Sequence, residues 1–209
     1  MKMKNINWNL VLGACLLLIV VAGCLISFCY LPYPPNVMDN VHAYLKPGMD
    51  LSHLLGTDQY GRDILSRILV GSRTVLLIGF VSVIGGALFG SVLGASAAMI
   101  KGIYGTIVMR AIEGLIAFPG TLLALMLVAV VGRGQRGAIM AIAIYTIAPF
   151  ARLTYTLILE NESLLAIKAA RSFGTGSLRI LSHYYMPELL PRLLTQFSAS
   201  VGSAIMTEA

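Results

Sequence analysis

Long runs of apolar residues constrain this chain more than any other feature of its sequence. The first covers residues 10–30. Four more follow it: residues 74–100, a run that ends near residue 131, residues 138–159, and a run that begins at residue 193. An α-helix needs about 20 apolar residues to cross a hydrocarbon core of roughly 30 Å, and lipid offers no water to an unpaired backbone. The runs therefore predict an all-α polytopic membrane protein with five spans.

Composition agrees with this interpretation. Of 209 residues, 57% are hydrophobic and 11% are charged, and the mean hydropathy is +0.84, far from the roughly 25% charge of a soluble domain. The net charge of +6 comes from basic residues between the apolar runs, which indicates membrane topology and no nucleic-acid partner. The three cysteines, Cys15, Cys24 and Cys29, all lie in the first run and form no disulfide framework or metal-ligand pattern.

The first apolar run has two interpretations. Lys2 and Lys4 precede it, and Val21-Ala22-Gly23-Cys24 resembles the cleavage box of a bacterial lipoprotein signal. However, the run stays apolar beyond Cys24 and further spans follow. We therefore favour an uncleaved first helix.

The polar segment before the last run has a regular pattern. Ser163 is expected to cap a short helix over residues 164–173, and Gly174 to end it. Ser177 is expected to cap a second helix that ends at Pro187. Two short helices joined by a sharp glycine turn would project from the membrane as a docking knob.

This segment resembles the docking loop of permease subunits from binding-protein-dependent ABC importers. The loop of that family reads E-A-A, three residues, G, nine residues, then I-x-L-P. Ala169, Ala170, Gly174 and Pro187 keep that spacing. The positions that depart from it are Lys168, Tyr184 and Met186, in place of the glutamate, isoleucine and leucine.

A second resemblance lies in the polar loop over residues 31–72, which Pro32, Pro34 and Pro35 open. Its second half is similar to the segment before the second span in the dipeptide, oligopeptide and nickel branch of these permeases. The matching residues are Gly56, Thr57, Asp58, Gly61, Arg62, Asp63, Ser66 and Arg67. Residues 62–69 alternate polar and apolar positions at helical spacing, which predicts a helix lying in the membrane interface.

Two histidines in this loop raise the question of a metal site. His42 and His53 lie among Asp39, Asp50 and Asp58 without the tight spacing of a ligand set. We interpret them as solvated loop residues and expect no metal.

The spans carry further signals. Gly86, Gly90 and Gly94 recur every four residues and predict close packing against another helix. Pro119 is expected to kink the third span, which residues 109–120 introduce. The spans also carry charged residues. Arg110 and Glu113 are expected to form an interfacial ion pair, and the side chain of Arg152 is expected to reach toward the cytoplasm.

Basic residues also set an orientation. With the amino terminus inside, nine basic residues are cytoplasmic and six are outside, which favours this arrangement. The chain then divides into the first helix (1–30), an extracytoplasmic loop (31–73) and a permease core (74–209), with a cytoplasmic docking loop over 160–192. The resembled permeases have six spans, so the chain is expected to be a fragment or a naturally truncated protein.

The resemblance implies a permease subunit in the bacterial inner membrane, part of an ATP-driven importer of dipeptides, oligopeptides or nickel complexes. It implies two cytoplasmic ATPase subunits, a second homologous permease and an extracytoplasmic binding protein as partners, besides membrane lipid. The sequence has no G-x-x-x-x-G-K-[ST] loop, so ATP and Mg are expected on the ATPase subunits, with no cofactor in this chain and no enzymatic activity.

In the docking loop, Ala169, Ala170 and Gly174 are expected to allow close backbone approach, and Lys168 and Arg171 to supply charge contacts. Two alternatives stay open: an ATP-independent transporter or channel, and a nonfunctional remnant of a permease. The first is expected to place ionisable residues at mid-membrane, whereas the charges here lie near the ends of spans.

Overall fold

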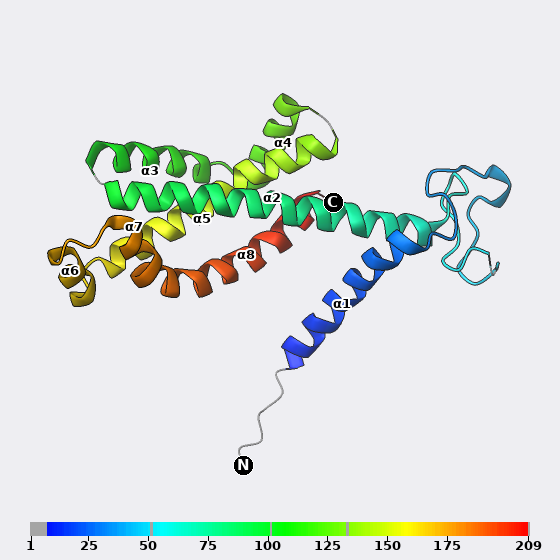
Figure 1. Ribbon diagram of the computed structural model, residues 1–209. Coiled ribbons are helices and arrows are strands. Elements are labelled where there is room, and N and C mark those ends of the chain that lie inside the picture. Colours follow the sequence, from blue (N-terminus) through cyan, green and yellow to red (C-terminus); the bar gives the residue numbers. More distant parts are fainter. Residues whose placement is uncertain (1–7, 51, 101, 133, 209) are drawn as a thin grey trace, which may run out of the picture. The chain divides into compact units, whose positions relative to one another are not determined.

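The computed structural model describes residues 8–50, 52–100, 102–132 and 134–208. These residues form helices and loops, with a single isolated β-bridge between Thr57 and Asp63 and no strand in the described ranges. The predicted all-α class is confirmed. The chain divides into two compact units, Met1–Leu77 and Ile78–Ala209, which are described separately (Figure 1).

The first unit holds α1 (Trp8–Cys29), the short 3-10 helix η1 (Asn40–His42) and the first turns of α2 (Ile64–Ile100). The helix α1 continues through Cys24, and almost all of its side chains are exposed, as expected for a helix surrounded by lipid. Its last turn contacts α2 where the Arg73 guanidinium lies 4.5 Å from the centre of the Phe28 ring. Lys2 and Lys4 lie outside the described residues.

The second unit holds the rest of α2 and seven further helical segments. In order, these are α3 (Gly102–Ala117), α4 (Gly120–Val131), α5 (Gln135–Asn161), α6 (Leu165–Ser172), α7 (Ser177–Ile180), the π-helical turn η2 (Leu181–Tyr185) and α8 (Met186–Glu208). Three buried apolar clusters hold this unit together, and α2 and α5 contribute to all three. Figure 1 shows α5 running along α2 in the middle of the bundle.

Glycines let the backbones of α2 and α5 approach closely. A Cβ placed at Gly86 would lie 2.6 Å from the Cβ of Thr146, and one at Gly90 would lie 2.9 Å from the Cβ of Phe150. At Gly94 the added atom would run into the backbone of Ala151. The face of α2 that carries these three glycines is therefore the face that packs on α5.

Several helices are long and apolar enough to cross a membrane. They are α1, α2 and α5, with the bent pair α3 and α4 as a fourth if it forms one span. The spans expected over 10–30 and 138–159 agree with α1 and α5. The expected fifth span, from residue 193, falls within α8, a helix that carries Glu188 and Arg192 near its start and is not among those four.

Two predicted boundaries were wrong. The helix expected in the membrane interface is the beginning of α2, because the 37 residues from Ile64 to Ile100 form one helix without a break near Thr74. The third span is not a single kinked helix. It breaks at Phe118 and Pro119 into α3 and α4, which meet at an angle of 100°, because proline cannot donate the backbone hydrogen bond that a continuous helix needs.

Candidate functional site

The loop between α5 and α8 folds around a glycine turn. Gly174 has a φ of +76°, and its N–H donates to the carbonyl of Arg171 at 2.9 Å. The N–H of Thr175 donates to the carbonyl of Ala170 at 3.0 Å. This pair of bonds is the Schellman motif, which ends a helix when the next residue tolerates a left-handed backbone. The prediction that Gly174 ends the first short helix is confirmed.

The predicted caps were wrong. The Ser163 hydroxyl donates to the carbonyl of Glu160 at 3.3 Å, and α6 begins at Leu165 without a side-chain cap. Likewise, α7 begins at Ser177, so Ser177 is its first helical residue and Gly176 occupies the cap position without a side-chain bond. Extended backbone at Leu164 and Gly176 starts the two helices instead.

Pro187 does not end the second helix, because α7, η2 and α8 follow one another directly to Glu208. In the wider π turn the N–H of Met186 donates to the carbonyl of Leu181, five residues earlier. A proline lacks the N–H and crowds the preceding turn, and a π turn relieves that crowding. The π turn just before Pro187 therefore lets the helix continue.

The loop has a buried face and an exposed face. Its buried side chains are Ile167, Ala170, Ile180 and Tyr185, which pack with residues of α2, α5 and α8. The exposed face carries three large apolar side chains, Leu165, Phe173 and Leu178, which are 84%, 88% and 81% exposed. We call these three residues the apolar knob. Sequence reasoning missed it, although Phe173 next to Gly174 was a visible signal.

This arrangement corrects part of the expected docking surface. Ala170 is only 5% exposed because its own chain covers it, so it cannot provide a partner with close approach. Ala169, Gly174, Lys168 and Pro187 are exposed.

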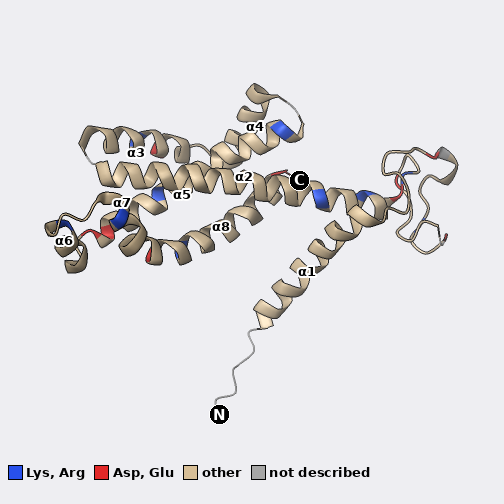
Figure 2. Cartoon of the chain, in the orientation of Figure 1, with Lys and Arg blue, Asp and Glu red and all other residues tan. Residues whose placement is uncertain are grey.

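Charges gather at this end of the second unit, on α6, α7 and the start of α8 (Figure 2). Arg171 donates to the Glu162 carboxylate at 2.8 Å. Arg192 lies 3.3 Å from Glu188 and 3.7 Å from Glu160, joining α8 to the end of α5. Arg171 therefore stabilises the fold of the loop, whereas Lys168 is exposed and forms no ion pair with another described residue.

The loop of the first unit is held together by the residues of the predicted family motif. Gly56 and Gly61 have φ values of +78° and +70°, and a Cβ at either would run into a backbone carbonyl. The buried Thr57 hydroxyl donates to the carbonyl of His42 and accepts from the N–H of Leu45 at 3.0 Å. This part of the motif therefore maintains the shape of the loop.

Its charged residues pair within the loop. The Asp58 carboxylate accepts bonds from the N–H groups of Tyr60 and Arg62 and from the Arg62 guanidinium at 2.7 Å. His42 pairs with Asp39 at 2.7 Å, and this contact raises the pKa of His42 and lowers that of Asp39. Among the described residues, no group of three or more His, Cys, Asp or Glu could hold a metal.

Asp63 occupies the junction between the loop and α2. Its buried carboxylate accepts from the backbone N–H of Ser66 at 2.7 Å and contacts His53 Nδ1 at 3.1 Å. Burial works against the charged form, but the bonds from Ser66 and His53 outweigh it and hold the pKa of Asp63 below its ordinary value. The expectation that His53 is solvated was wrong, because its side chain is only 12% exposed. Asp63 and Ser66, which were assigned to the polar face of a helix, are buried because the loop folds back over them, whereas Arg67 is exposed.

Replacing Asp63 with alanine is expected to loosen this junction by about 1–3 kcal/mol, because the first turn of α2 loses its cap and His53 its partner. Hydrogen exchange at Ser66 in the detergent-solubilised chain should accelerate roughly tenfold or more. Because the folded pKa is lowered, the charged form stabilises the loop above pH of about 4 and this contribution fades as the pH falls further.

Asp50→Ala is the matched control, since among the described residues the Asp50 carboxylate accepts hydrogen bonds only from the nearby Ser52. Exchange at Ser66 should stay at the wild-type rate in this variant. Equal acceleration in both variants would mean that general loss of charge, and not the cap at Asp63, governs the junction.

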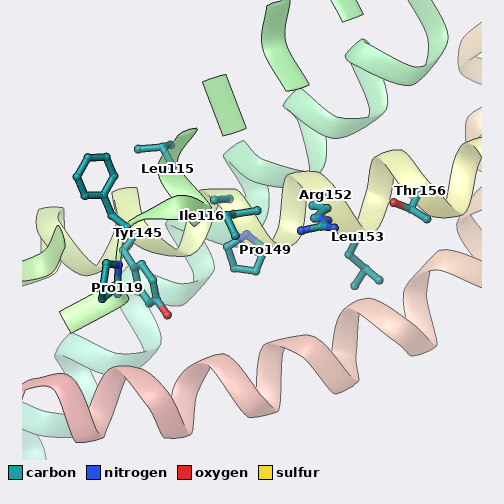
Figure 3. Close-up of a pocket in the computed structure, with 11 residues that line it drawn as sticks. Leu115, Ile116, Pro119, Tyr145, Pro149, Arg152, Leu153 and Thr156 are labelled. Atoms are coloured by element: carbon teal, nitrogen blue, oxygen red, sulfur yellow. The ribbon is translucent and has the colours of Figure 1, made fainter. Parts of the chain in front are cut away.

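A groove of about 660 Å³ opens where α3 breaks into α4 and faces α5. Tyr145, Pro149, Arg152 and Thr156 line it from α5, and Figure 3 shows Pro119 beside the Tyr145 ring. Tyr145 and Pro149 also line a second hollow of about 230 Å³ against α8. The two hollows therefore adjoin one another along one face of α5.

Comparison with known proteins is consistent with this architecture. Residues 86–209 match a family described as the binding-protein-dependent transport system inner membrane component. The glutathione transport system permease protein GsiD of Pectobacterium atrosepticum is 39% identical over 165 residues, covering 79% of this chain and 55% of the relative. GsiD proteins of Escherichia coli and Shigella boydii are each 37% identical over 167 residues, covering 79% of this chain and 54% of the relative.

The chain belongs to the binding-protein-dependent transport system inner membrane component family, the permeases of ABC importers in the bacterial inner membrane. It spans about half the length of the curated relatives that it matches. The resemblance that the two sequence motifs indicated is thereby confirmed.

Proposed function

We propose that this chain is a transmembrane permease subunit of an ATP-driven importer, and that the loop from α6 to α8 docks on a cytoplasmic ATPase. The apolar knob carries this proposal. Three large apolar side chains on a short charged loop are too exposed to serve the chain's own core, and exposed apolar side chains among polar residues are typical of a protein interface.

The rest of the loop is suited to transmit a movement. Its buried residues join it to α2, α5 and α8, so a displacement of the knob would be passed to the helices that form the bundle. ATP and Mg would bind the ATPase subunits, and their preference for one conformation of the assembly would drive the switch between inward-open and outward-open states. The amino terminus would then be cytoplasmic.

The substrate is proposed to be a short peptide, delivered by an extracytoplasmic binding protein to this chain and a second permease. Support comes from relatives that are permeases for glutathione, which is a tripeptide. Nickel complexes are the second candidate, supported by the resemblance of residues 56–67 to the peptide and nickel branch.

Phe173→Asp tests the docking role. A carboxylate in place of Phe173 would have to lose water on docking, which costs several kcal/mol without a partner. The variant should recover less than about a tenth of the wild-type ATPase when the complex is purified from its native membrane in mild detergent, and ATP-dependent uptake should fall in parallel.

Phe173→Leu is the matched control, because it preserves an apolar side chain at the same position and should retain most of the ATPase. Full ATPase recovery with Phe173→Asp would overturn the docking assignment. Loss of the ATPase in both variants would indicate a specific need for the aromatic ring, and not for an apolar surface.

A further inference from the structure

Arg152 has an unusual position for a charged residue of a spanning helix. It lies within α5, one of the helices that can cross the membrane, and about 14 Å of helix separates it from the end at Asn161. Its side chain is exposed and lines the groove at the α3–α4 break. An ionisable residue within a spanning helix is costly and is usually functional.

Arg152 lacks an internal counter-charge. No hydrogen bond or ion pair joins it to another residue in the described parts of the chain, whereas Arg110 and Arg171 each pair with a glutamate at 3.0 Å and 2.8 Å. A guanidinium offers five donors arranged to grip a carboxylate with two parallel bonds. The groove thus presents an unused anion-binding group.

The lining of this groove is mostly apolar, with a few polar groups near Arg152. Tyr145 and Thr156 share this groove, and the adjoining hollow is lined by Gln196, Ser200 and Ser203 of α8. Pro149 lies between Tyr145 and Arg152 and has no N–H, so the carbonyl of Tyr145 lacks its usual helical donor. Donors and an acceptor therefore follow one another along a single face.

We propose that Arg152 binds a carboxylate of the peptide as it passes through the permease, with Tyr145 and Thr156 as additional donors. The inference rests on the proposed import function and assigns the substrate contact within it. The volume of about 660 Å³ is within the range of small-molecule pockets, roughly 300–1,000 Å³. Because the groove is partly open and does not enclose its contents, the contact would guide the substrate without trapping it.

The test uses the complete importer with its binding protein, reconstituted in proteoliposomes and supplied with glutathione. Arg152→Ala and Arg152→Gln should each lower uptake about tenfold or more, since a charge-assisted pair is lost, while Arg152→Lys should retain an intermediate rate. Arg110→Ala is the matched control, because Arg110 lies on α3 outside the groove, and it should transport at the wild-type rate.

A second measurement distinguishes direct contact of Arg152 with the substrate from a purely structural role of Arg152. Phenylglyoxal modifies exposed guanidinium groups, and mass spectrometry reports the site. In the wild-type importer, glutathione should slow modification of Arg152 at least several-fold relative to Arg110, a ratio that corrects for the phenylglyoxal consumed by the glutathione thiol. Wild-type uptake by Arg152→Ala, or modification of Arg152 that glutathione does not slow, would overturn the proposal.

Two further outcomes would indicate a different role for Arg152 or a different function for the importer. If Arg152→Ala and Arg152→Gln both fail to retain the second permease, Arg152 belongs to a subunit interface and the substrate contact is wrong. If the wild-type importer takes up neither glutathione nor other short peptides, the proposed peptide import itself fails. Normal wild-type uptake together with unaffected variants overturns only the role of Arg152.

Discussion

Gly90→Leu should abolish the stable packing of α2 on α5. A Cβ at Gly90 would lie 2.9 Å from the Cβ of Phe150 and closer still to the carbonyl oxygen of Ile147. A backbone carbonyl inside a helix cannot move aside, so the two helices would have to separate. We expect a loss of more than about 3 kcal/mol, which for a chain of this size lowers the thermal unfolding temperature by about 6–12 °C.

The measurement is thermal unfolding of the purified chain in detergent, with Gly114→Leu as the control. No described atom lies within 4 Å of a Cβ placed at Gly114, which is also in a helix, so the same substitution should change the unfolding temperature little. Equal unfolding temperatures for Gly90→Leu and the wild-type chain would show that the contact of α2 with α5 is not a main source of stability.

These glycines also illustrate how much of the fold the sequence could predict. Four-residue spacing of Gly86, Gly90 and Gly94 identifies the face of a helix that packs, because side-chain size and helical period are local properties. The identity of the partner, α5, depends on the path of the chain in space. Apolar length likewise predicted α1 and α5, but not the 100° bend between α3 and α4.

The functional site was predictable where one residue type determines the backbone. Gly174 ends α6 with a positive φ because few other residues tolerate it. The caps predicted at Ser163 and Ser177 were wrong, because many serines could cap a helix and the local backbone conformation decides which one does. The burial of Ala170 was also not predictable from the sequence. In the motif it looks like a surface residue, yet α2 and α5 cover it.

The loop before α2 shows the same limit. Periodicity assigned Asp63 and Ser66 to a polar face of a helix, and Asp63 does cap α2 while Ser66 lies in its first turn. What periodicity cannot show is that the preceding loop folds back over that face, with the N–H of Tyr33 donating to the Ser66 hydroxyl at 3.1 Å. A contact between residues so far apart in sequence depends on the complete loop, and its polar residues were therefore mistaken for solvated ones.

Gly174→Val should uncouple the docking loop while the bundle stays folded. Gly174 has a φ of +76° and no described atom lies within 4 Å of a Cβ placed there, so the whole penalty comes from the backbone. A β-branched residue in the left-handed region costs about 1–3 kcal/mol. The chain should relieve this by unwinding the end of α6, which moves Phe173 away from the rest of the apolar knob.

Gly176→Val is the control that shows whether the backbone conformation at the glycine or the size of the new side chain causes the loss of transport. Gly176 lies two residues further on, also without a described neighbour within 4 Å of an added Cβ, but its φ of −64° and ψ of 149° suit valine. In reconstituted importers, Gly174→Val should lose uptake by about tenfold or more, and Gly176→Val should transport normally. Because Ile167 and Ala170 anchor α6 through their own buried contacts, both variants should stay folded, with a loss of no more than about 1–3 kcal/mol in Gly174→Val and little change in Gly176→Val. Wild-type uptake by Gly174→Val would mean that the glycine turn shapes the loop without coupling it to transport, and the apolar knob would then have to act independently of the angle between α6 and α7.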